Sequence, residues 1–256
     1  MMMMIFCKQQ LEQPLSMRPF GFDVGKYVVW TIGLPSEPVV NVISGVRFAN
    51  IPSRSLDGHA ESSMFVPLPP RLESSLRDSP AISRVFDGWS ELALPNCWLV
   101  AGAVMQSFWN REYGFPALHG ISDIDLIYFD ADDLTEETEN KHYLRINSCY
   151  KDVGIRFDVK NEARVHLWYE DRFGYPIVAY TSAEAAMETF PTTVGSIGVR
   201  PNGQVLEAFA PFGFDDLMNL IIRPNKRQIT RTIYEGKVAR WKPNWPRVNY
   251  LEWDDI

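Results

Sequence analysis

The segment SDIDLIYFD, residues 122–130, has the alternating pattern of a β-strand that is buried on one face. In such a strand Asp123 and Asp125 project from the same face, about 7 Å apart. Ile124 and Leu126 project from the opposite face, toward a core. Neighbouring carboxylates repel each other unless a cation lies between them, and hard oxygen ligands suit Mg²⁺ or Mn²⁺. The pattern therefore indicates a divalent metal site; the alternative is a pair of ordinary solvated acids at the end of a strand.

A glycine turn precedes this strand. The segment WLVAGA, residues 98–103, leads from a short buried strand over residues 97–100 into a helix over residues 103–111. Gly102 stands at the turn, where free backbone N–H groups at a helix start can bind phosphate. Many strand-to-helix turns contain a glycine, so Gly102 indicates a phosphate site only in combination with the carboxylates.

A third carboxylate follows on a later predicted strand. Residues 155–159 alternate in the same way, which places Asp158 on the face opposite Phe157. Asp158 can complete a two-metal site, in which one cation activates the attacking oxygen and the other steadies the leaving group. The alternative is an ion pair with Arg156 or Lys160, which share its strand face.

The composition is that of a globular chain. Its 256 residues are 46% hydrophobic and 22% charged, with a net charge of −7, which excludes collagen-like and disordered chains. The acidic balance also disfavours a globally basic nucleic-acid coat protein. The cysteines form no CxxC motif, which is typical of a reducing compartment. Because neither a signal peptide nor a membrane span is indicated, we expect a cytoplasmic protein with no membrane partner.

The predicted elements divide the chain near residue 80. Residues 1–80 are an N-terminal extension of unknown role, with strand-like segments at 27–32 and 39–48 and a Ser/Pro-rich passage. Residues 81–256 mix helices with strands, and the Asn-Gly turn at 202–203 predicts an antiparallel hairpin. This mixture favours an α+β fold over a doubly wound parallel sheet. The further predicted helices cover residues 82–92, 132–147, 161–170, 185–190, 214–222 and 229–241.

The C-terminal segment at residues 223–247 is strongly basic. It holds eight basic residues and one acidic residue, a net charge of +7. Such a segment, with aromatic residues between the charges, can bind a triphosphate or follow an RNA backbone. Arg231 and Arg240 are candidate nucleotide contacts; the alternative is a solvated helix face paired with the acidic segment at residues 130–139. Arg164, in an earlier predicted helix, can equally meet a phosphate or pair with an acidic neighbour.

Several separate segments together resemble a known family. They are WLVAGA at 98–103, DIDLIYFD at 123–130, VKNEARVH at 159–166, APFGFDDL at 210–217, RPN at 223–225 and KPNWP at 242–246. The set is similar to a bacterial nucleotidyltransferase-like family of the DNA polymerase β-type nucleotidyltransferase superfamily. The resemblance implies a nucleotidyltransferase fold, with a small mixed β-sheet flanked by helices.

The resemblance also implies roles for single residues. Asp123, Asp125 and Asp158 would hold divalent metal. In the enzyme that we expect from these features, Asp158 is also the candidate base for the proton of the acceptor hydroxyl. Gly102 and Ala103 would approach the triphosphate. The wider superfamily often has a serine at the position of Ala103, and its hydroxyl contacts phosphate.

These features predict a metal-dependent enzyme with Mg²⁺ or Mn²⁺ as its cofactor. It would move a nucleoside monophosphate from an NTP to an acceptor hydroxyl and release pyrophosphate, mostly by positioning and charge neutralisation. The acceptor is open among RNA, a protein and a small molecule. The alternative is a catalytically weak regulator of the same fold that binds a nucleotide or RNA. Ala103 supports that alternative, and the three carboxylates oppose it.

Overall fold

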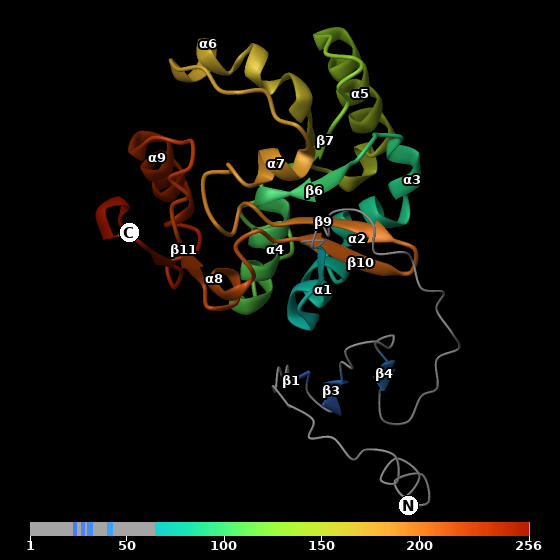
Figure 1. Ribbon diagram of the computed structural model, residues 1–256, viewed down its shortest axis with the longest axis vertical. Coiled ribbons are helices and arrows are strands. Elements are labelled where there is room, and N and C mark those ends of the chain that lie inside the picture. Colours follow the sequence, from blue (N-terminus) through green and yellow to red (C-terminus); the bar gives the residue numbers. More distant parts are fainter. Residues whose placement is uncertain (1–22, 25–26, 29, 33–39, 43–64, 256) are drawn as a thin grey trace, which may run out of the picture. The chain divides into compact units, whose positions relative to one another are not determined.

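The computed structural model describes residues 23–24, 27–28, 30–32, 40–42 and 65–255 (Figure 1). The chain divides into two compact units, Met1–Glu61 and Ser62–Ile256. Two antiparallel strand pairs are described in the first unit: β1 (Asp23–Val24) with β2 (Tyr27–Val28), and β3 (Trp30–Ile32) with β4 (Val40–Val42). The rest of the strand expected at residues 39–48, and most of the Ser/Pro-rich passage, lie outside the described residues.

The second unit is built on a mixed sheet of six strands (Figure 1). They are β5 (Phe65–Pro67), β6 (Trp98–Val100), β7 (Asp123–Tyr128), β8 (Arg156–Asn161), β9 (Gly198–Asn202) and β10 (Val205–Phe209). Their order is β5-β10-β9-β6-β7-β8, and every neighbouring pair is antiparallel except the parallel pair β7 and β8. This arrangement confirms the α+β prediction, and the predicted hairpin is present as β9 and β10.

Helices and short strands complete the second unit, and no helix among its described residues has the length and apolar character to cross a membrane. The α-helices are α1 (Pro70–Arg77), α2 (Pro80–Asp87), α3 (Trp89–Leu92), α4 (Ala101–Tyr113), α5 (Glu136–Cys149), α6 (Tyr169–Phe173), α7 (Ala183–Met187), α8 (Asp215–Met218) and α9 (Arg231–Trp241). The 3-10 helices are η1 (Lys151–Val153), η2 (Glu162–Leu167) and η3 (Trp253–Asp255), and a parallel pair joins β11 (Ile221–Ile222) to β12 (Asn249–Tyr250).

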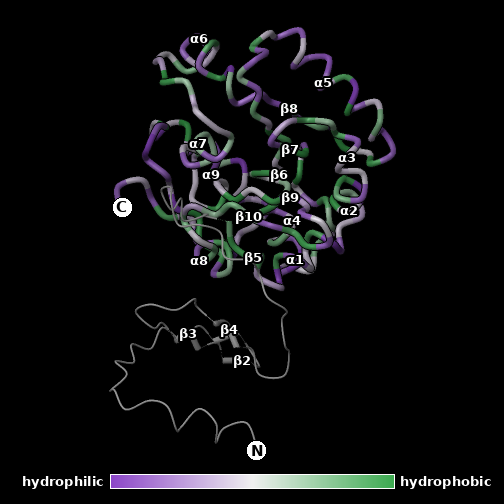
Figure 2. The backbone as a smooth tube through the Cα atoms, turned by 45° about the vertical axis from the view of Figure 1, so that its right-hand side comes forward, coloured by the Kyte–Doolittle hydropathy of each residue, from purple (hydrophilic) through white to green (hydrophobic). Residues whose placement is uncertain are grey.

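Alternating residues of the strands contribute to two hydrophobic clusters. Leu99 and Leu126 belong to the main core, together with residues of α1, α2, α4 and α9. Their neighbours Trp98 and Ile127 point the other way and pack against α7 in a smaller cluster. Figure 2 shows hydrophobic residues along the central strands and mainly hydrophilic residues along α5. The central strands therefore pack against hydrophobic residues on both faces.

The second unit begins earlier than the predicted boundary near residue 80. β5 pairs with β10, and α1 buries Leu72 and Leu76 completely. The proline-rich composition of the residues just before residue 80 suggested a linker. However, Pro70 occupies the first position of α1, where the fixed φ of proline suits a helix start. Residues 65–80 therefore belong to the unit that contains the sheet.

Several predicted helices differ in the structure. The helix predicted over residues 82–92 is divided at Gly88 into α2 and α3. The helix predicted over residues 132–147 begins later, as α5, and the side chain of Thr135 caps it. The helix predicted over residues 161–170 is η2 followed by the short α6, and the side chain of Asn161 caps η2. Finally, α8 is a single turn, and the two residues expected to end that helix form β11.

Candidate active site

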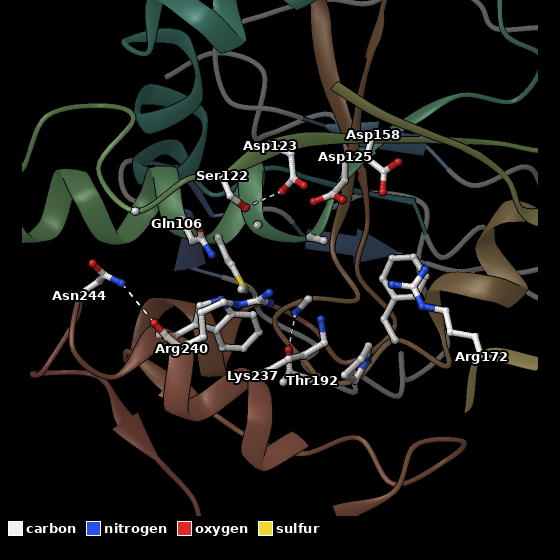
Figure 3. Close-up of a pocket in the computed structure, with 18 residues that line it drawn as sticks. Gln106, Ser122, Asp123, Asp125, Asp158, Arg172, Thr192, Lys237, Arg240 and Asn244 are labelled. Atoms are coloured by element: carbon white, nitrogen blue, oxygen red, sulfur yellow. Dashed lines mark hydrogen bonds between the residues drawn. The ribbon is translucent and has the colours of Figure 1, made fainter. Parts of the chain in front are cut away.

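The three aspartates predicted as metal ligands lie on one wall of a cavity of about 470 Å³. The parallel register of β7 and β8 places Asp125 beside Asp158. Asp123 and Asp125 alternate with buried residues, so both face away from the core. Figure 3 shows the three carboxyl groups directed into the cavity. The structure thus brings together all three residues.

Asp125 has the most perturbed environment of the three. Burial, followed by the charges of Asp123 and Asp158, raises the pKa of Asp125 to about 7. Lys237 and a backbone hydrogen bond from Gly102 oppose this shift. A cation would offset the repulsion among the carboxylates, and carboxylate oxygens are ligands that Mg²⁺ and Mn²⁺ prefer. The chemistry of this donor set therefore fits a divalent metal.

The two outer aspartates already have partners. Asp123 accepts hydrogen bonds from Ser122 Oγ at 2.8 Å and from Arg156 Nη2 at 2.6 Å. Asp158 lies 3.5 Å from Lys160 Nζ, so one of the ion pairs that the sequence left open is present. With these pairings, no three acidic, histidine or cysteine side chains of the described residues form a group that could hold a metal ion as they stand. Arg156, whose side chain is 56% exposed, would compete with a metal ion for the carboxylate of Asp123.

The start of α4 also borders the cavity. Ala101 has a φ of +54°, in the left-handed region, which costs a non-glycine residue roughly 1–2 kcal/mol. Val100 supplies no side-chain cap to the first turn. Gly102 and Gln106 line the cavity, whereas Ala103 is fully buried and does not. Of the two residues predicted to approach a triphosphate, only Gly102 is at the cavity surface.

A basic wall faces the carboxylates across the cavity (Figure 3). Lys237 and Arg240 project from α9, and Arg172 projects from α6. Burial, with a smaller contribution from the charge of Arg240, lowers the pKa of Lys237. A carboxylate wall opposite a cationic wall suits a polyanion that carries a metal ion.

Two residues of this wall were missed in the sequence. Lys237 lies three positions before Arg240 and four before Trp241, so all three share one helix face. That spacing could have identified Lys237. No local signal marks Arg172, which reaches the cavity only through the packing of α6.

Comparison with known protein families matches residues 87–250, more than half of the chain, to the nucleotidyltransferase family. The chain belongs to this family. A solved NMR structure, described as revealing a CCA-adding enzyme head domain, is similar to this nucleotidyltransferase with a TM-score of 0.60 and 23% sequence identity. The similarity covers 71% of this chain and 94% of the other, and it shows a shared fold. A search of curated proteins finds no match. The resemblance seen in the sequence is thus confirmed at the level of the nucleotidyltransferase family and fold.

Two arginines predicted as nucleotide contacts in this nucleotidyltransferase lie outside the cavity. Arg164 is buried and donates a hydrogen bond to Glu139 at 2.8 Å, so it connects η2 to α5. Arg231 pairs with Asp254. It precedes Arg240 by nine residues, which is about 14 Å along the helix axis and half a turn around it. The basic segment therefore reaches the carboxylate site through one face of α9, the face that carries Arg240.

Proposed function

We propose that this nucleotidyltransferase moves a nucleoside monophosphate from an NTP to an acceptor hydroxyl, with Mg²⁺ or Mn²⁺ as its cofactor. One observation carries the proposal: three carboxylates face a group of cations across a single cavity. The carboxylates offer ligands to a metal, and the cations offer partners to phosphate oxygens. An NTP with its metal needs both.

In the proposed reaction, the acceptor oxygen bonds to the α-phosphorus, the bond to the β-phosphate breaks, and pyrophosphate leaves. Asp158, at the edge of the carboxylate wall, takes the proton of the hydroxyl. Lys237 and Arg240 bind phosphate oxygens, and Gly102 lets the triphosphate approach the backbone at the start of α4. A divalent cation held by the three aspartates would neutralise the negative charge that develops on the phosphate oxygens during transfer.

The acceptor class is open among RNA, a protein side chain and a small alcohol. RNA is the first to test, because the chain shares its fold with a domain described as the head of a CCA-adding enzyme. The assay therefore offers all three classes in parallel.

The full chain is incubated with each of the four NTPs, radiolabelled at the α-phosphate, and with Mg²⁺, Mn²⁺ or EDTA. Cellular RNA, the protein itself and glycerol are offered as acceptors, and both label transfer and pyrophosphate release are measured. We expect metal-dependent transfer that Asp125→Asn lowers by roughly 100-fold or more. Asp132→Asn, which changes an exposed aspartate beyond β7, is the matched control and should not affect transfer.

Transfer in EDTA, or full activity in Asp125→Asn, would contradict the proposal. Metal-dependent nucleotide binding without transfer to any acceptor would favour the regulator that the sequence left as the alternative. Both results come from the same set of reactions, with binding measured by calorimetry.

A further inference from the structure

A second cavity, of about 480 Å³, adjoins the first. Asp158, Arg172, Lys237 and Arg240 line both cavities, as do Phe190 and Pro191, and these residues form the common border. Beyond this border the second cavity has a different character, because aromatic rings make up much of its wall. These rings belong to Trp168, Tyr169, Phe173 and Tyr180.

Glu162 is the unusual polar group of the second cavity. Its side chain is 6% exposed and lines the cavity. Among the described residues, the structure gives its carboxyl group no hydrogen bond and no ion pair. Neighbouring cations have other partners, since Arg164 bonds to Glu139 and Lys160 lies 3.5 Å from Asp158. Buried polar groups in native proteins are nearly always paired, so an unpaired one directed into a cavity points to a ligand.

The surroundings of Glu162 favour its protonated form. Burial, followed by the charge of Glu139 on α5, raises the pKa of Glu162 to about 8. On β8, Lys160 opposes the shift and Asp158 adds to it, as does Asp125 on β7. A protonated carboxyl presents one donor and one acceptor side by side. It can therefore form two hydrogen bonds with a ligand edge that also carries one of each.

The aromatic rings around this carboxyl group are held in place by their neighbours. The rings of Tyr169 and Phe173 lie with centroids 4.5 Å apart. The hydroxyl of Tyr180 accepts a hydrogen bond from Gln228 Nε2 at 2.8 Å. Because these side chains are already ordered, a planar ligand can stack on them at a low cost in entropy.

We propose that the second cavity is a nucleobase site, in which the aromatic rings stack on the base and Glu162 reads its hydrogen-bonding edge. A nucleobase is planar, carries donors and acceptors on one edge, and is joined to a phosphate that the border cations can bind. The inference rests on the proposed function for that last contact. The base is that of the incoming NTP or that of the terminal nucleotide of an acceptor RNA.

The test titrates the full chain with adenosine, cytidine, guanosine and uridine, and follows binding by calorimetry. At least one nucleoside binds, and Glu162→Ala lowers its affinity roughly 5- to 150-fold, as expected for a lost two-bond contact to a base edge. Glu162→Gln still offers a donor and an acceptor and keeps most of the affinity. Glu170→Ala, which changes an exposed glutamate on α6, is the matched control and binds as the wild type does.

Failure of every nucleoside to bind the wild-type chain, or unchanged affinity in Glu162→Ala, overturns the inference. A second test changes the nucleoside in place of the protein, so it does not depend on whether a variant folds. Analogues of the bound nucleoside that lack one donor or acceptor of the base edge bind more weakly to the wild-type chain. Equal binding of all such analogues also overturns the inference.

Further measurements separate the two sources of the base and the two proposals. A non-hydrolysable NTP displaces the nucleoside when the base is that of the NTP, and leaves it bound when the base is that of the acceptor. Asp123→Asn keeps the nucleoside affinity, because Asp123 lines only the first cavity and is not among the charges that shift the pKa of Glu162. Nucleoside binding that depends on Glu162 in a chain without transfer activity refutes the proposed function alone. Transfer that proceeds with nucleoside affinity unaffected by Glu162→Ala refutes this inference alone.

Discussion

Replacing Glu162 by glutamine is expected to stabilise the protein, and to do so increasingly as the pH rises. Burial and the charge of Glu139 raise the pKa of Glu162 from its ordinary value of 4.5 to about 8 in the folded chain. The unfolded chain therefore releases this proton first, so a rise in pH between these two values favours unfolding of the wild type. Each pH unit corresponds to about 1.4 kcal/mol, which gives about 5 kcal/mol over the whole interval. Glutamine keeps the shape of the side chain and does not titrate.

The assay is urea unfolding of both full-length proteins at pH 5 and pH 8.5, followed by circular dichroism. The gain in unfolding free energy from Glu162→Gln is expected to be roughly 3–5 kcal/mol larger at pH 8.5 than at pH 5. Glu170→Gln, at an exposed position, is expected to give the same small difference at both pH values. A gain from Glu162→Gln that stays constant within about 0.5 kcal/mol would refute the reasoning.

Three further predictions concern the first cavity. Arg240→Ala is expected to lower NTP affinity and to make that affinity less dependent on salt concentration. Arg231→Ala is expected to leave both quantities unchanged. If the two variants change NTP affinity equally across a salt titration, the assignment of the two faces of α9 is wrong. Gly102→Ala is expected to weaken NTP binding in calorimetry. Its unfolding free energy should stay within about 1 kcal/mol of wild type, since the nearest atom to the added Cβ is Gln106 Nε2 at 3.4 Å. Lys237→Met is expected to lower NTP affinity roughly 10-fold or more by removing a charged donor, and wild-type affinity would exclude Lys237 as a phosphate contact.

The centre of the candidate site was predictable because it depends on local patterns. Alternation of apolar and polar residues is visible in the residue types of β7 and β8, and it determines which side chains share a face. Alternation alone does not align one strand with another. Asp125 lies beside Asp158 because the two strands pair in parallel in that register. The convergence of these residues was expected from the family resemblance together with the alternation.

The cationic side of the site was less predictable, because it depends on how distant segments pack. Counting charges identified the basic segment without showing which face of α9 turns inward. Trp241 packs on Trp109 with ring centroids 6.4 Å apart, and this contact places the face that carries Lys237 at the cavity. Arg164 is a similar case, since its partner Glu139 lies 25 residues away on another helix.

The charged residues Asp158, Arg172, Lys237 and Arg240 line both cavities, whereas other residues line only one of them. Asp158 and Lys237 line both cavities, so a change at either one is expected to alter the proposed metal, phosphate and base contacts together. Gly102 lines only the first cavity and Glu162 only the second. Changes at these two positions therefore act on separate parts of the site. If one nucleotide spans the border, their effects on its binding are coupled; if an NTP and an acceptor occupy one cavity each, the effects fall on different molecules.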